Sequence, residues 1–160
     1  MAILEALGVL SEAQDLLNGQ EDSTNVILMP ALADLNWGEV WIDIITETPP
    51  TAAGGAADTY VIDVVISQES TLDTNLILLS IPMVHGDPRI STAGAQIACF
   101  DISKMIGDLA DASYKYIGLH TTLGDAGGTA GLGINAALSP SKPRTKDNVQ
   151  VTRSPVGLPG

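Results

Sequence analysis

The chain has 160 residues, enough for one domain with a sizeable core, and only 4% of them are aromatic, so aliphatic side chains must build that core. Its formal net charge is −12, and residues 1–88 hold 14 of the 19 acidic residues and none of the seven Lys and Arg residues. A body this acidic repels phosphate groups, which argues against direct binding to nucleic acid.

The N-terminal segment, residues 1–22, carries apolar side chains at helical spacing. Leu7, Leu10 and Leu17 lie three and seven positions apart, which predicts a short helix, although Gly8 lowers the helix propensity. An extended N-terminal arm is the alternative for this segment. Either way, we expect it to lie outside the main domain.

Residues 23–141 show a succession of strand patterns separated by turns. In GEVWIDIITET, Val40, Ile42 and Ile44 alternate onto one face. Further strands are expected in STNVILMP, TYVIDVVISQES, TNLILLSIPM ending at Pro82, QIACFDI, YKYIGLH and TAGLGINAAL. A helical turn is expected in FDISKMIGDLADAS. About seven or eight short strands without a long helix predict an all-β fold, an antiparallel sandwich or barrel.

Two segments are predicted to be exposed. The stretch PPTAAGGAAD, residues 49–58, is a Pro/Gly/Ala loop long enough to protrude. Residues 142–160 form a basic, Pro-rich tail with four of the seven cations: Lys142, Arg144, Lys146 and Arg153. The tail could dock on an acidic neighbour, such as another copy of the chain, or be a solvated terminus that supplies charge for solubility.

The stretch GLGINA, residues 131–136, matches the G-x-G-x-x-G/A pattern that holds a dinucleotide pyrophosphate. That site needs a helix beginning within the motif and an acidic residue about 20 positions further on. Here Leu138 runs straight into SPSKP, and Asp147 is the only acid that follows. We therefore interpret the match as accidental.

The glycines of this region are predicted to build a hairpin instead. Gly127 and Gly128 would supply positive φ at its turn. Gly131 and Gly133 would leave room on the returning strand for a closely packed backbone or aromatic ring. The side chains expected to cover this glycine face are those of Tyr114 and Tyr116.

Candidates for chemistry are few. Cys99 is the only cysteine, which excludes an intrachain disulfide, and its apolar surroundings in AQIACFDI predict a buried, inert thiol. We expect His85 in a loop and His120 at the end of a strand, each without a ligand partner nearby in sequence. No nucleophile elbow or calcium loop is found. The sequence predicts no catalytic, cofactor-binding or metal-binding residue.

Trp37 and Trp41 stand four residues apart around Gly38. They could form an exposed aromatic pair for a carbohydrate or protein partner, or one could lie in the core and the other at a sheet edge. The choice decides whether the chain has an aromatic binding platform.

The hydropathy of the chain indicates where the protein is made and whether it self-associates. No stretch reaches the roughly 18 apolar residues of a membrane span, and the chain lacks the basic start of a signal peptide, so we expect cytoplasmic synthesis and no membrane partner. A mean hydropathy of +0.24 combined with exposed sheet edges would favour aggregation of a monomer. We therefore expect a homo-oligomer.

Six segments carry a likeness to a known family: LSEAQDL, STNVILMP, DLNWGEVWIDIIT, YVIDVVISQES, LLSIPMVHGDPRISTAGAQIACFDI and YKYIGLHTTLGDAGGTAGLGINAALSP. With these segments, which span residues 10–141, the chain resembles the capsid cement (decoration) proteins of tailed bacteriophages, of the jelly-roll kind. The last segment, a Tyr-x-Tyr strand followed by a glycine turn and a strand of small residues, is the most specific.

The resemblance implies a jelly-roll-like β-sandwich over residues 23–141 and a non-catalytic role in the virion. Such a protein binds the outer surface of the expanded head across neighbouring major capsid subunits, as a homodimer or homotrimer, without a cofactor. We expect the loop at 49–58 and the two termini to make these contacts. The alternative is a glycan- or receptor-binding β-sandwich module of a virion that uses Trp37 and Trp41; an enzyme ranks third.

Overall fold

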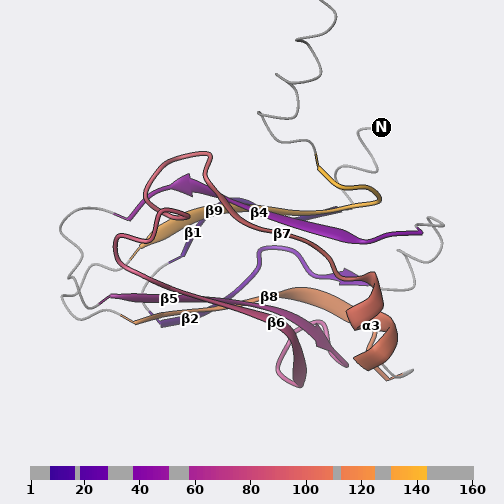
Figure 1. Cartoon of the computed structure of the whole chain (residues 1–160). Coiled ribbons are helices and arrows are strands. Elements are labelled where there is room, and N and C mark those ends of the chain that lie inside the picture. The colour runs from indigo at the N-terminus through magenta and orange to yellow at the C-terminus, as the bar shows by residue number, and fades with distance from the viewer. Residues whose placement is uncertain are drawn as a thin grey trace, which may run out of the picture.

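The computed structural model describes residues 8–16, 19–28, 38–50, 58–109, 113–124 and 131–143. Two antiparallel sheets pack face to face, with one short helix at an end of the sandwich (Figure 1). Sheet A has the order β1 (Val9–Leu16), β9 (Leu132–Ser139), β4 (Trp41–Thr48) and β7 (Gln96–Asp101). Sheet B has the order β2 (Gly19–Asp22), β8 (Tyr116–Gly124), β5 (Thr59–Ser67) and β6 (Asn75–Val84), and β3 (Ile27–Leu28) also pairs with β8. The predicted all-β antiparallel sandwich is confirmed.

The strand pairing is nested along the chain. β1 pairs with β9, β2 with β8, β4 with β7 and β5 with β6. Only β2 to β3 and β5 to β6 are consecutive strands of one sheet, and every other step along the described strands crosses to the opposite sheet. The predicted helical turn is also confirmed, as α3 (Ser103–Leu109) between β7 and β8. The sandwich is therefore complete only when β1, the first described strand, pairs with β9, the last.

Aliphatic side chains fill the space between the sheets, as the composition requires. Val40, directly before β4, and Ile42 and Ile44 of β4 are all buried, as their alternation predicts. The largest fully buried side chains are Tyr60, Leu10, Leu16, Ile42, Ile44, Ile62, Ile66, Leu72, Ile90, Ile102, Ile117 and Leu119. Burial of so many branched side chains is the main driving force for this fold.

The N-terminal helix predicted within residues 1–22 is wrong over residues 9–16 and 19–22, where the chain forms β1 and β2. Leu10 and Leu16 are fully buried core residues, so the segment belongs to the sandwich and not to an arm outside it. The pairing register of β1 shifts twice before Gln14, and Ala13 has a φ of 45°. These bulges interrupt the alternation that identifies a strand in a sequence. Residues 1–7 lie outside the described part of the chain.

The predicted hairpin in the glycine-rich region is also wrong. β8 and β9 lie in different sheets, so the chain crosses the sandwich between them, and residues 127–128 lie outside the described ranges. Tyr116 is a residue of β8 in sheet B and does not cover the glycines of β9. The close approach at Gly133 is real, because a Cβ there would lie 3.0 Å from the backbone nitrogen of Thr48. That glycine permits close packing of β9 against the end of β4.

Strand β6 continues through Pro82, where we predicted that it would end. β6 is an edge strand, so one side of its backbone has no neighbouring strand. The Pro82 carbonyl accepts a hydrogen bond from Arg89 Nη2 at 3.1 Å, so the outward side of the backbone at this residue faces the connection to β7. A missing N–H on that side removes no ladder hydrogen bond.

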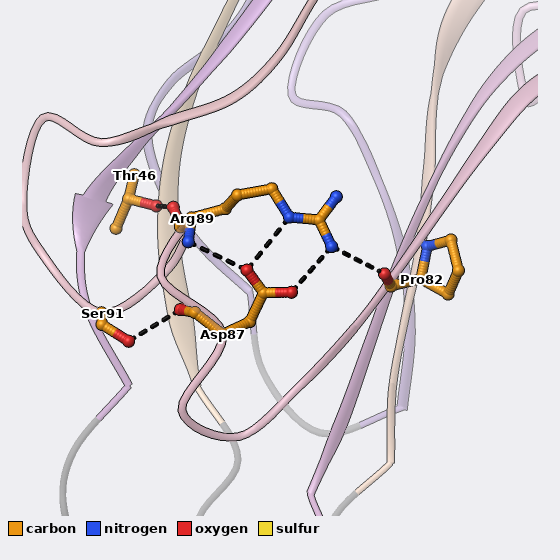
Figure 2. Close-up of polar contacts among 5 residues, drawn as sticks. All are labelled: Thr46, Pro82, Asp87, Arg89 and Ser91. Atoms are coloured by element: carbon orange, nitrogen blue, oxygen red, sulfur yellow. Dashed lines mark hydrogen bonds and ion pairs between the residues drawn. The ribbon is translucent and has the colours of Figure 1, made fainter.

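The connection from β6 to β7 links the two sheets through a polar cluster (Figure 2). Asp87 accepts hydrogen bonds from Arg89 Nε at 3.0 Å and from Arg89 Nη2 at 2.7 Å. Thr46, which is fully buried on β4, donates its hydroxyl to the Arg89 carbonyl at 2.7 Å, and Ser91 donates to the Asp87 carbonyl at 2.7 Å. Because Arg89 also reaches Pro82, this cluster fastens the edge of sheet B to the inner side of sheet A.

Replacing Thr46, whose side chain is fully buried, with Val removes the hydroxyl that donates to the Arg89 carbonyl. The unpaired carbonyl lowers the free energy of unfolding by about 1–3 kcal/mol, measured by urea denaturation. Thr71→Val, the same change in an exposed turn, is the control and shifts the free energy by less than about 0.5 kcal/mol. Equal effects of the two substitutions would contradict a role for this hydrogen bond.

The Asp87–Arg89 ion pair makes stability depend on pH. Side-chain hydrogen bonds from Arg89 lower the pKa of Asp87 below its ordinary 3.8, so the stabilisation is complete above the unfolded-state pKa and is lost as the pH falls through the folded-state pKa. The difference in unfolding free energy between the wild type and Asp87→Asn therefore shrinks as the pH is lowered from about 5 to about 2. Denaturation at a series of pH values checks this, and a difference that does not change with pH would contradict it.

Candidate functional site

The histidines and acids of the described residues do not gather into a metal site: no group of three or more His, Cys, Asp or Glu could hold an ion there. His85 lies directly after β6 in the connection to β7, as expected. His120 was expected at the end of a strand but lies in the middle of β8. Within the same part of the chain, no helix is long and apolar enough to cross a membrane.

A small cleft beside His85 is lined by Pro50, His85, Gly86, Ile90 and Ser91. Its volume is about 210 Å³, below the roughly 300–1,000 Å³ typical of small-molecule sites. His85 Nδ1 is buried there without a hydrogen-bond partner. As formed by these residues, the cleft has room for water beside the imidazole but not for a typical ligand.

Cys99 lies on β7, an edge strand of sheet A, opposite Asp43 of β4. The thiol is half-buried, so the prediction of full burial is wrong; an edge strand leaves one flank open. Partial burial raises the pKa of Cys99, the Asp43 carboxylate raises it further, and the ammonium group of Lys142 lowers it. A thiol with a raised pKa is a poor nucleophile near neutral pH.

Trp41 projects from the outer face of sheet A, since its neighbours Val40 and Ile42 point into the core. Its indole Nε1 donates to Glu39 Oε2 at 2.7 Å. Lys142 Nζ lies 5.7 Å from the centre of the ring, a cation–π distance. The polar edge and one face of this indole are therefore already engaged, and Trp37 lies outside the described residues.

A row of polar side chains crosses the outer face of sheet B, and nothing in the sequence analysis singled it out. The pairing register aligns Asp22 of β2, His120 of β8, Asp63 of β5 and Ser80 of β6. His120 Nδ1 lies 2.9 Å from Asp22 Oδ1. Only the register brings these residues together, because they are distant in the sequence.

Asp63 is the unusual member of this row. Its neighbours Ile62 and Val64 belong to the core between the sheets, so Asp63 points outward, yet only 8% of it is exposed. Its Oδ1 atom is buried and has no hydrogen-bond partner. Burying part of a carboxylate without a partner is costly. No strand of sheet B contains a Lys or Arg that could compensate it.

Most of the exposed large hydrophobic residues in the described ranges lie on sheet B. Leu28 is 41%, Ile77 49% and Val84 59% exposed on its strands, whereas Phe100, 44% exposed, lies on β7 of sheet A. Of these residues, Ile77 is in the row next to Asp63, because it pairs with Val65. Leu72 of the β5–β6 turn covers the neighbouring part of this face, because a Cβ on Gly118 would lie 2.7 Å from its Cδ1 atom.

We name this region the Asp63 face: Asp63 with Asp22 and His120 in its row, and Val61, Ile77 and Pro82 in the flanking rows. It combines carboxylates with partly exposed aliphatic groups. Such a surface suits a partner that presents a positive charge on an apolar stem.

No protein-family model matches this chain, and no curated protein matches it. The function must therefore be inferred from the chain's own sequence and geometry.

The electrostatic surroundings of Cys99 predict how fast it is alkylated. Asp43→Asn removes a negative charge that raises the pKa of the thiol, so iodoacetamide should react faster, whereas Lys142→Gln should slow the reaction. Each change is less than about tenfold, the effect of one pKa unit on the thiolate fraction. Asp73→Asn, in an exposed turn, is the control with the same change in charge. An unchanged or slower rate for Asp43→Asn would contradict the assignment.

Proposed function

We propose that this chain is a capsid cement (decoration) protein of a tailed bacteriophage, which binds the outer surface of the expanded head across neighbouring major capsid subunits and stabilises it. The proposed role involves no catalysis and no cofactor. Its partners are the major capsid protein and further copies of the chain, and its location is the virion.

The nested strand pairing is the observation that carries this proposal. Eight strands that pair first with last, in two facing four-stranded paths, follow the order of a jelly roll, and we assign the fold to that type. The six segments that resemble cement proteins fall on the strands of this sandwich, from LSEAQDL on β1 to TAGLGINAAL on β9. The likeness thus follows the architecture of one domain and not a local motif.

The net negative charge of the chain and the lack of an evident catalytic arrangement among its described residues support the same role. A net charge of −12 suits a protein that avoids nucleic acid and meets a basic protein surface. A protein that touches several lattice subunits gains avidity from contacts that are individually weak. Neither the His85 cleft nor Cys99 offers an arrangement that would favour a reaction.

The alternative is a glycan- or receptor-binding module that uses Trp37 and Trp41, of which Trp41 is partly exposed on sheet A and Trp37 lies outside the described residues. It is less well supported, because Glu39 and Lys142 already engage the Trp41 indole. Quenching of tryptophan fluorescence by a soluble sugar, lost in Trp41→Ala, would favour this alternative.

Purified protein should bind expanded heads that lack it and should saturate at a fixed ratio of copies to capsid subunits, because each site spans several subunits of a symmetric lattice. Co-sedimentation followed by densitometry measures that ratio. Isolated capsid subunits are the control and should bind far more weakly. Protein that stays in the supernatant with intact expanded heads would refute the proposal.

The loop expected at residues 49–58 can be tested in the same assay. Asp58 is fully buried and its carbonyl accepts a hydrogen bond from the His85 backbone at 3.1 Å, so it belongs to the domain body. Residues 51–57 lie outside the described ranges. Replacing only 51–57 with a Gly-Ser linker of equal length should reduce head binding severalfold if the loop makes contacts. Unchanged occupancy would remove the loop from the interface.

A further inference from the structure

We infer that the Asp63 face is a docking surface for a lysine or arginine side chain of a partner protein, which pairs with the Asp63 carboxylate. The inference deepens the proposed function, on which it rests for the identity of the partner: the basic side chain belongs to the outer surface of a major capsid subunit.

The buried carboxylate is the first reason. Asp63 is only 8% exposed, and its Oδ1 atom has no hydrogen-bond partner. The isolated protein therefore bears a desolvation cost without a compensating bond. An incoming ammonium or guanidinium group that pairs with the carboxylate compensates its charge.

The surrounding charges point to a cationic partner. Asp22 lies in the same row, joined to His120 at 2.9 Å, so two carboxylates lie along one line across the sheet. No Lys or Arg lies on any strand of sheet B. Arg89, at the sheet edge, is already held by Asp87 and the Pro82 carbonyl. The carboxylates of this row therefore attract a positively charged group of a partner, and no Lys or Arg on the strands of sheet B competes with that group.

The apolar residues explain why a long basic side chain fits better than a small ion. Val61 and Pro82 lie in register on one side of the row, and Ile77, 49% exposed, lies on the other. The methylene stem of Lys or Arg packs against such groups while its head reaches the carboxylate. The described residues contain no cluster fit for a metal ion. The face thus matches a protein side chain.

Head binding by Asp63→Asn tests the inference. This isosteric change removes the charge, and head affinity should fall by about 30-fold or more, as expected for losing one partner of a desolvated ion pair. Asp108→Asn, the same charge change at an exposed position of α3, is the control and should stay within about twofold of the wild type. If the wild type binds heads and Asp63→Asn binds equally well, the inference fails while the proposed function stands.

The melting temperature of the free protein provides an independent readout. Because the substitution Asp63→Asn removes the buried charge, the variant should melt roughly 2–4 °C higher than the wild type. A variant that is less stable than the wild type would show that Asp63 is satisfied within the chain, and would overturn the inference whether or not the protein binds heads.

A third measurement identifies the occupant without any capsid. N-acetylarginine methylamide, titrated into the wild type at millimolar concentrations, should shift the backbone amide resonances of Val61, Asp63 and Thr122, and should not shift them in Asp63→Asn. Absence of shifts, or equal shifts in both proteins, overturns the inference.

A variant with Arg144, Lys146 and Arg153 all changed to Gln tests whether the chain's own tail occupies the Asp63 face. If these changes alone move the same resonances in the free protein, the tail is the occupant and the partner assignment is wrong.

Discussion

Strand β9 is the element on which the rest of the sandwich depends, because it joins the first strand of the chain to the middle of sheet A. It pairs with β1 on one side and with β4 on the other, and its inner face buries Leu132, Ile134 and Leu138. Without it, sheet A separates into a lone strand and the β4–β7 pair. Since β9 comes last among the described strands, the core cannot close until nearly the whole domain has been synthesised, and such non-local pairing folds slowly.

The closure of the sandwich also determines where binding can occur. The inner faces are filled by aliphatic side chains, and the cluster of Thr46, Asp87 and Arg89 fastens one end of the sheets together. The interior is thus closed to a ligand, which leaves the loops, the termini and the outer surface of each sheet for recognition. The two outer surfaces differ: sheet A presents Trp41 with Lys142 over its ring and Asp43 beside Cys99, whereas sheet B presents the Asp63 row flanked by Ile77. The two faces therefore offer different groups to a partner.

Elements set by neighbouring residues could be predicted from the sequence, whereas elements set by pairing between distant strands could not. Regular alternation, as at Ile42 and Ile44, depends only on neighbouring residues and predicted β4 correctly. β1 was missed because two bulges interrupt its alternation, and the β8–β9 hairpin was wrong because local turn chemistry does not reveal whether a turn stays in one sheet or crosses to the other. The Asp63 row is set by pairing across distant strands, so no local pattern predicts it. Its local signal is a single acid within the β-branched run of β5.

Lys142 and the Asp63 face lie on opposite faces of the sandwich. Lys142 follows β9 and lies over Trp41 on the outer side of sheet A, whereas the Asp63 face belongs to the outer side of sheet B. A polypeptide joined after Pro143 in place of residues 144–160 therefore starts on the side of the sandwich opposite the proposed docking surface. If sheet B binds the particle, a foreign domain fused at this position would be displayed on the side that faces away from the particle.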